Sequence, residues 1–277
     1  MLGASSSGAG VEIAEEDRKL FAAEAAAILK VEKERTQASC PGSSIPGRVS
    51  FPLAEPRYNA KRPLQFGPFA AALQDFAPQR AATLDTLLAG KNLLELQATM
   101  AGGELNAVEL VTYYVARIRQ YDVDRFNSVL ELNPEALPIA AALDAERAAG
   151  HVRGPLHGIP VLLKDNIATG DQMHTTAGAY ALRDWRADRD AFLVQKLRRA
   201  GAVILGKTNL SEWANFMDPC MPNGFSVLGG QTRSPYGPFD PSGSSSGSAV
   251  AVAANFAAVS VGSETSGSLI WPARFNS

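Results

Sequence analysis

The sequence of 277 residues has few of the residue types that metal sites and disulfides require. Its two cysteines are Cys40 and Cys220, and its three histidines are His151, His157 and His174. Because the cysteines lie far apart, we expect two free thiols in a reducing compartment. The histidines are scattered, and no Cys/His cluster has metal-ligand spacing. We therefore expect neither a metal ion nor a cofactor.

The sequence also lacks a strong excess of charge of one sign and long apolar runs. The formal net charge is -2, which gives no electrostatic reason to expect nucleic acid or an anionic membrane as a partner. The nearest candidate for a membrane span, residues 249–261, is interrupted by Asn255 and is shorter than the ~18 apolar residues required. Residues 1–11 lack the basic start and apolar core of a secretory signal. We expect a cytoplasmic protein without a membrane span.

What is present is the composition of a globular protein, with 46% hydrophobic and 19% charged residues. Acidic residues early and basic residues late in 12–36 favour a helix there. Six prolines in residues 41–68 indicate an irregular arm. We expect residues 1–80 to form this N-terminal helix and proline-rich arm, and residues 81–277 to form the main domain.

The main domain alternates between two kinds of hydrophobic pattern. Gly102–Gly103 should break a helical region that runs from about residue 85 to 121, and Asn106 is a plausible cap for its second half. Short apolar strands then alternate with helices, which favours an α/β fold with a mixed, mostly parallel sheet and helices on both faces. The expected strands are 127–132, 161–163, 202–205 and 259–261, and the expected helices are 138–149, 191–200 and 246–258.

Two motifs match known signatures but lack the required context. Residues 201–208 fit the P-loop pattern, yet a helix precedes them and an apolar strand lies between their glycines, which inverts the P-loop order. Residues 243–247 fit the nucleophile elbow, but three prolines in residues 234–242 exclude the strand that must precede it. No histidine follows His174 to complete such a triad. We expect a buried strand at the first motif and no α/β-hydrolase triad at the second.

A third pattern remains, made of two loops rich in glycine and serine. Residues 242–248 open a helix of small residues, and residues 262–268 follow the next strand. Small residues let backbone amides approach a ligand, and successive amides can hold an oxyanion. A serine at the end of such a loop could attack a carbonyl, and lysine is the known alternative to histidine as its base. Taken on composition alone, flexible loops without a function account for the pattern equally well.

Several segments together resemble the amidase signature family, over roughly residues 90–275. Residues 241–254 and 262–269 look like the signature itself, and residues 154–167 (Gly-Pro-Leu-His-Gly-Ile-Pro-Val-Leu-Leu-Lys-Asp-Asn-Ile) resemble the family's lysine-bearing strand. Residues 175–178, 206–213 and 229–236 are also similar, in the family's order. Any one of these motifs is weak evidence, but the set is highly specific.

The resemblance implies a Ser–cis-Ser–Lys triad. By motif position Ser268 is the nucleophile, Ser244 the cis-serine and Lys164 the base. The family's oxyanion-hole amides fall on Thr265, Ser266, Gly267 and Ser268 itself. The substrate would be a small-molecule or peptide amide, hydrolysed at its C–N bond through an acyl-enzyme.

A lysine that acts as the base must be neutral, because only the neutral amine can accept a proton. The pKa of a free lysine is about 10.4, and burial beside the apolar residues 161–163 would lower it. Asp165 either orients the lysine or faces solvent in a turn. The other serines of the first loop, Ser245, Ser246 and Ser248, are expected to be structural.

The sequence also departs from the family. Ser266 stands where many members have glycine, and Ile270 stands where many have arginine. Glu264-Thr265 is closer to peptide-amidase-like members than to the tRNA-dependent amidotransferase subunit. Family domains are much longer, so residues 81–277 correspond to the N-terminal portion of one, and the chain is expected to be C-terminally truncated. An inactive remnant and a glutamine-hydrolysing amidotransferase subunit remain as alternatives, and the oligomeric state is not predicted.

Overall fold

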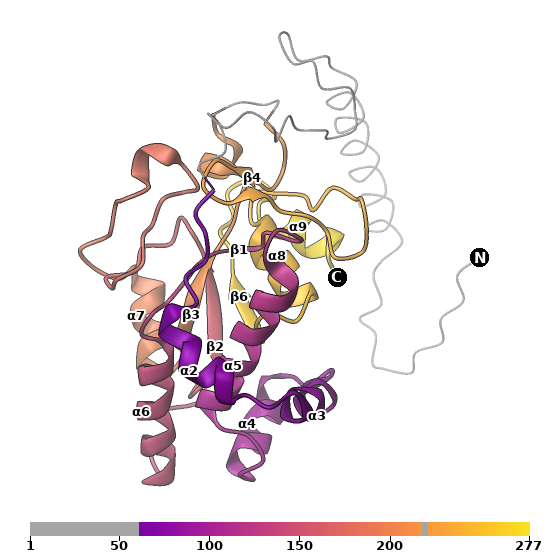
Figure 1. The fold of residues 1–277 in the computed structure, drawn as a ribbon. Helices are drawn as coiled ribbons and strands as arrows, with labels where there is room; N and C mark the ends of the chain where they lie inside the picture. Colours follow the sequence, from indigo (N-terminus) through magenta and orange to yellow (C-terminus); the bar gives the residue numbers. More distant parts are fainter. Residues whose placement is uncertain (1–60, 218–220) are drawn as a thin grey trace, which may run out of the picture. The chain divides into compact units, whose positions relative to one another are not determined.

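The computed structural model describes residues 61–217 and 221–277 (Figure 1). The helix expected at 12–36, most of the proline-rich arm, Cys40 and Cys220 lie outside these residues. The described residues include every residue of the predicted site.

A four-stranded sheet forms the centre of the domain. Its strands are β1 (Val129–Leu132), β2 (Pro160–Lys164), β3 (Val203–Thr208) and β6 (Val259–Val261), in the order β1-β3-β2-β6. β2 is parallel to both of its neighbours, whereas β1 is antiparallel to β3. The expected mixed, mostly parallel sheet is confirmed. A separate antiparallel pair consists of β4 (Phe225–Ser226) and β5 (Gly230–Gln231).

Helices cover both faces of this sheet, as expected (Figure 1). Leu162 and Val203 pack into a core built with α5, α6 and α8, whereas Val161 and Ile204 pack against α7. This division follows from the alternation of side chains along a strand. The helices are α2 (Ala70–Asp75), α3 (Pro78–Leu88), α4 (Leu93–Ala101), α5 (Ala107–Arg117), α6 (Ala136–Ala148), α7 (Phe192–Arg199), α8 (Ser246–Ala253) and α9 (Ile270–Phe275). Short helical turns are η2 (Gly67–Phe69), η3 (Ile118–Asp122), η4 (Tyr180–Leu182) and η5 (Glu212–Asn215).

Helical structure begins earlier than the sequence patterns indicated. Phe69 and Leu73 are buried in the same core as the sheet and α5, and α3 crosses residue 80. Pro78 occupies the first turn of α3, where its missing N–H costs nothing. Proline therefore starts a helix here, and residues 61–80 pack with the main domain.

Asparagine side chains cap two of the helices. Asn106 accepts a hydrogen bond from the Glu109 amide at the start of α5, as expected. Asn92 forms a capping box with Glu95 at the start of α4. α4 ends at Ala101, just before Gly102–Gly103, which confirms the predicted break.

A bulge in β3 decides which side chains face the predicted site. The pairing with β2 shifts between Val161↔Ile204 and Leu162↔Gly206, and a bulge of this kind turns the following side chains to the other face. As a result Thr208 contacts Ser248 on α8, whereas Lys207 contacts the loop after β2. Gly206 sits where a Cβ atom would lie 2.3 Å from the Glu131 carbonyl oxygen.

The P-loop-like and elbow-like motifs have the structural context that their sequences predicted. α7 precedes Gly201, and the supposed phosphate loop is the buried strand β3. Residues 234–242 contain no strand, so residues 243–247 do not follow a strand-to-helix elbow. No helix in the described ranges combines the length and apolar character that crossing a membrane requires.

Candidate active site

Lys164 is the last residue of β2 and is fully buried, with 0% of its surface exposed. Its Nζ atom donates hydrogen bonds to Ser244 Oγ at 2.7 Å and to Ser263 Oγ at 2.9 Å. The structure therefore brings the predicted base and the predicted cis-serine into direct contact. A third hydroxyl, Ser263, joins them, although the sequence patterns did not single it out.

Burial changes the protonation of this lysine. Loss of hydration lowers the pKa of Lys164 to about 8, and the negative charge of Glu264 partly opposes that shift. Burial penalises the ammonium form, because a charge loses more hydration than a neutral amine does. A substantial fraction of Lys164 is therefore neutral near pH 8, as a general base requires.

Ser244 lies at the start of the loop that leads into α8. The Gly243–Ser244 peptide bond is cis, as the cis-serine of the resembled family would be. The Ser244 carbonyl accepts a hydrogen bond from the Ser211 amide at 3.0 Å. Gly243 packs closely here, since a Cβ atom would lie 2.4 Å from Ser211 Oγ.

Ser245 joins the two glycine- and serine-rich loops. Its backbone amide donates to the Ser268 carbonyl at 3.0 Å. Its hydroxyl donates to the Ser263 carbonyl and accepts from the Ser263 amide, each at 3.2 Å. Ser245 thus links the loop of residues 262–268 to the loop that contains Ser244.

Ser268 is half-buried at the end of the second loop. Within residues 61–217 and 221–277 its hydroxyl makes no hydrogen bond to Ser244. The structure therefore places the predicted nucleophile on the loop adjoining the Lys164–Ser244 pair, with a backbone tie between the loops.

One of the amides predicted to hold an oxyanion, that of Gly267, contacts the carboxylate of Glu264 in the same loop. The Glu264 carboxylate accepts hydrogen bonds from the amides of Gly267, Leu269 (2.5 Å) and Ile270 (3.2 Å). These amides, that of Leu269 foremost, lower the pKa of Glu264. Thr265 and Ser266 are exposed. In this structure the Gly267 amide therefore donates its hydrogen bond to Glu264 of the same loop.

A second buried lysine supports the loop after β2. Lys207 donates to the Ile167 carbonyl at 2.8 Å and to Thr175 Oγ1 at 2.9 Å. Asp165 is also fully buried, so it does not face solvent. Its Oδ2 atom accepts from the Thr176 amide at 3.1 Å, and burial raises the pKa of Asp165 to about 6.

Three residues of the site were missed by the sequence patterns, namely Asn166, Ser263 and Glu264. Parallel pairing offers a signal for Ser263. Leu163 on β2 pairs with Val261 on β6, so the residues just beyond both strands meet at one edge of the sheet. Asn166 donates to Ser263 Oγ at 3.0 Å from the same edge.

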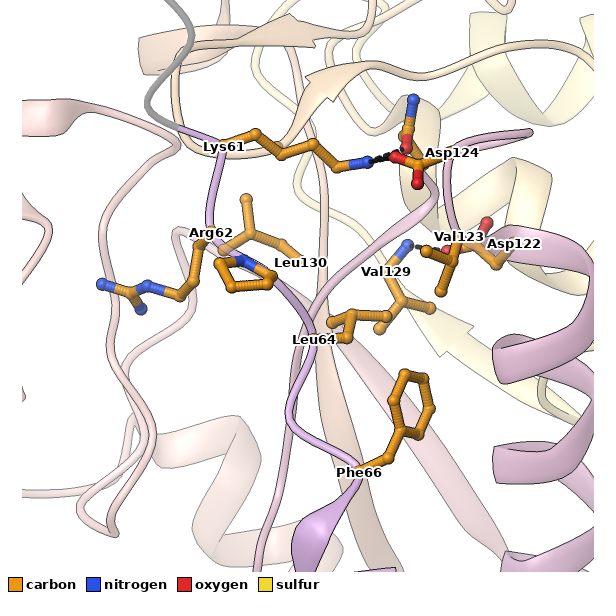
Figure 2. A pocket seen from close by; sticks show the side chains of 12 residues that line it. Lys61, Arg62, Leu64, Phe66, Asp122, Val123, Asp124, Val129 and Leu130 are labelled. Carbon is orange, nitrogen blue, oxygen red and sulfur yellow. Dashed lines mark hydrogen bonds and ion pairs between the residues drawn. The ribbon is translucent and has the colours of Figure 1, made fainter.

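A cavity of about 190 Å³ lies apart from this chemistry. Figure 2 shows Lys61 reaching Asp124 at one end, with Leu64 and Phe66 along the apolar side. The cavity is lined by none of the predicted catalytic residues. The candidate active site is therefore defined by its hydrogen-bonded groups at the carboxyl ends of β2 and β6. In the described part of the chain, no group of three or more His, Cys, Asp or Glu side chains could hold a metal ion.

Comparison with known proteins shows which family this sequence is similar to. The amidase family model matches residues 109–277. A Schizosaccharomyces pombe protein whose name places it among the amidases is 49% identical over 183 residues, which are 66% of this chain and 31% of that protein. The chain thus spans about a third of this relative's length.

A solved structure of the peptide amidase from Stenotrophomonas maltophilia is 54% identical, with a TM-score of 0.65. The match covers 67% of this chain and 38% of the peptide amidase chain. A glutamyl-tRNA(Gln) amidotransferase subunit of Thermobifida fusca is 43% identical over 180 residues, 65% of this chain and 35% of that protein. Because the family model matches more than half of this chain, the chain belongs to the amidase family.

Proposed function

We propose that this protein hydrolyses the C–N bond of a carboxamide, with Ser268 as nucleophile, Ser244 as proton relay and Lys164 as base. The observation that carries the proposal is the 2.7 Å hydrogen bond between Lys164 Nζ and Ser244 Oγ, made in a buried site. A neutral amine held against a serine hydroxyl can accept its proton, which is the function a general base must perform.

The reaction has two halves, acylation and deacylation. Ser268 Oγ attacks the amide carbonyl carbon, its proton passes to Ser244, and the proton of Ser244 passes to Lys164. The tetrahedral oxyanion is held by backbone amides of the loop 265–268. When the C–N bond breaks, the proton returns through Ser244 to the departing ammonia or amine. Water then attacks the acyl-enzyme ester by the same relay, which releases the carboxylate and restores Ser268.

The Ser268 hydroxyl must meet Ser244 for this relay to operate. The tie from the Ser245 amide to the Ser268 carbonyl, at 3.0 Å, keeps the two loops adjacent. Catalytic hydrogen bonds are often longer in free enzymes than in substrate complexes. We infer that a bound amide completes the contact between the two serines.

Peptide amides are the first substrates to test, since the Stenotrophomonas maltophilia relative is a peptide amidase. In the natural protein, Ser268→Ala should reduce ammonia release from a peptide carboxamide by at least about a thousandfold, because the nucleophile is lost. Mass spectrometry of the wild-type protein after rapid acid quenching should detect an acyl group on Ser268.

The matched control is Ser260→Ala on β6, because the buried hydroxyl of Ser260 has no hydrogen-bond partner among residues 61–217 and 221–277. This variant should hydrolyse the amide at the wild-type rate. Full hydrolysis by Ser268→Ala would refute the proposed nucleophile. A folded wild-type protein that hydrolyses none of a panel of amides would favour the non-catalytic alternative.

The second candidate function is the glutamine-hydrolysing subunit of a tRNA-dependent amidotransferase. The 43% identity to the Thermobifida fusca subunit favours it. The two candidates differ in substrate and in the need for a partner. Glutamine hydrolysis that appears only when partner subunits are co-purified would support the amidotransferase, whereas hydrolysis of peptide amides by the isolated protein would support the amidase.

A further inference from the structure

The amine of Lys164 has more hydrogen-bonding positions than its contact with Ser244 uses. A neutral amine carries two N–H groups and one lone pair, and only the lone pair can accept the proton of Ser244. Lys164 is 0% exposed, so water cannot satisfy the remaining N–H groups freely, and an unpaired buried donor is unfavourable. The acceptor that the structure provides is Ser263 Oγ, at 2.9 Å from Nζ.

Ser263 is itself held from two sides. Its backbone is tied to the Ser245 hydroxyl through both its amide and its carbonyl, at 3.2 Å each. Its side-chain oxygen receives the Asn166 Nδ2 donor at 3.0 Å. The position of this hydroxyl therefore does not depend on Lys164.

The hydrogen bonds of Ser263 keep the lysine lone pair from pointing at Ser263. A serine hydroxyl has two acceptor positions and one proton. One acceptor position takes the Asn166 N–H, and the other takes an N–H of Lys164. The Ser263 proton then points away from Nζ, so the lone pair of the neutral amine is left for Ser244.

We propose that Ser263 and Asn166 are positioning residues that direct the lone pair of Lys164 toward Ser244. The inference rests on the proposed function, in which Lys164 is the base. Without the pair, the Cε–Nζ bond can rotate among staggered positions, and most of these turn an N–H group toward Ser244. Rotation would leave the amine neutral but badly oriented.

The charges around Lys164 matter for any pH-dependent test. Glu264, on the loop after β6, is the charged group that acts on the Lys164 amine. Ser244 and Ser263 are neutral contacts from the α8 loop and the β6 loop. Asp165, next in the chain, is engaged with Thr176 and Gly178 instead. A substitution at Ser263 therefore leaves each of these charges in place.

The first test compares Ser263→Ala with Ser260→Ala in the natural protein. Ser263→Ala should lower kcat by about 10- to 100-fold, a part of what a general base contributes, with KM changed less than about threefold. The acidic limb of the kcat profile should also move to lower pH, because the hydroxyl accepts a hydrogen bond from the ammonium and stabilises it. The variant would thus be slower although more of its lysine is neutral.

Two further variants separate positioning from a structural role. Ser263→Thr keeps the hydroxyl and should recover most of the lost rate. Asn166→Asp places a carboxylate beside Ser263 and should move the acidic limb to higher pH, because a nearby negative charge favours the ammonium. Asn166 is exposed, so these changes test the contact without opening the core.

A readout without catalysis keeps this proposal distinct from the proposed function. The pH dependence of the Lys164 ¹³Cε chemical shift, followed by NMR on lysine-labelled protein and assigned with Lys164→Met, gives its pKa directly without requiring a reagent to reach the buried amine. Ser263→Ala should lower that pKa, and Ser260→Ala should not. If Ser263→Ala matches Ser260→Ala in both kcat and Lys164 pKa, the positioning role is wrong. If the pKa moves but Ser268→Ala still hydrolyses amides, the geometry holds and the catalytic assignment fails.

Discussion

At the scale of single residues, the proposed reaction depends on the protonation of Lys164. Burial lowers the pKa of Lys164 to about 8, while Glu264 raises it. A base whose pKa is about 8 is neutral above that pH and protonated below it. Since the proposed reaction requires the neutral amine, the rate of acyl transfer is tied to this titration.

We therefore predict that kcat/KM for amide hydrolysis rises with pH and reaches a plateau above about pH 8. Glu264→Gln should shift this rise to lower pH, because the variant removes the charge that favours the ammonium. Initial rates between about pH 6 and pH 10 provide the measurement. A Glu264→Gln profile displaced to higher pH would contradict the assigned electrostatic influence.

Asp165 and Lys207 show a different use of buried charge at the same scale. Lys207 bridges the Ile167 carbonyl and Thr175, and burial also lowers the pKa of Lys207, while Asp165 opposes that shift. Neither group contacts Ser244 or Ser268. Their contacts fix the loop that follows β2, so they act on the path of the chain around Lys164.

At the scale of elements, β3 depends on one close backbone approach. A Cβ atom on Gly206 would lie 2.3 Å from the Glu131 carbonyl oxygen of β1, and backbone atoms at that distance have to move. We predict that Gly206→Ala lowers the free energy of unfolding by about 2–4 kcal/mol through overpacking. Urea unfolding followed by circular dichroism is the measurement.

Gly67→Ala serves as the matched control for this prediction. No atom of the described residues lies within 4 Å of a Cβ placed on Gly67, so the effect of Gly67→Ala should stay within about 0.5 kcal/mol. Equal stabilities of the two variants would mean that β1 can retreat from β3 without loss.

The elements themselves were largely predictable, because their signals are local. The apolar residues 161–163 and 259–261 became β2 and β6 almost unchanged. Asn106 caps α5 as its residue type indicated. The start of helical structure before residue 85 was missed, because the prolines of residues 41–68 were interpreted as an irregular arm, whereas Pro68 lies in the first turn of η2 and α2 follows it directly.

The candidate site was predictable only in part, since hydrogen-bond partners depend on pairing between distant segments. Family resemblance supplied Lys164, Ser244 and Ser268. The contact of Asn166 with Ser263 joins residues 97 positions apart, and no local pattern encodes it. Glu264 was noticed as a sequence variant, but its hydrogen bonds to following amides require the fold of the loop.

At the scale of the whole molecule, three of the buried groups in the described part of the chain titrate on opposite sides of neutral pH. Burial raises the pKa values of Asp122 and Asp165 to about 6 and lowers that of Lys164 to about 8. Between about pH 6 and 8 all three groups are therefore mostly charged in the folded state. Between about pH 6 and 8 the desolvation of these three charged groups therefore lowers the free energy of unfolding most.

We predict that the free energy of unfolding has a local minimum near neutral pH. Below about pH 6 the folded state binds protons on Asp122 and Asp165 more readily than the unfolded chain, so stability rises as pH falls toward about 4. Above about pH 8 the folded state releases the proton of Lys164 before the unfolded chain does, so stability rises again. Each gain should amount to about 1–3 kcal/mol.

Urea unfolding at about pH 5, 7 and 9.5 tests this prediction. Lys164→Met should abolish the part of the stability gain above about pH 8 that Lys164 contributes. The stability gain below about pH 6 should remain. A single stability maximum at neutral pH would show that the three groups are hydrated in the folded protein. Burial would then be too small to explain a neutral lysine.

The pairing of β2 with β6 has a consequence for how this sequence can change. Leu163 faces Val261 across that pair, and a shift by one residue would move Ser263 by about 3.3 Å and reverse the face to which its side chain points. A hydrogen bond of 2.9 Å does not survive such a displacement. We therefore expect insertions and deletions between α8 and β6 to be less tolerable than substitutions there. The length of that connection affects the register of β6 and hence whether Lys164 contacts Ser263.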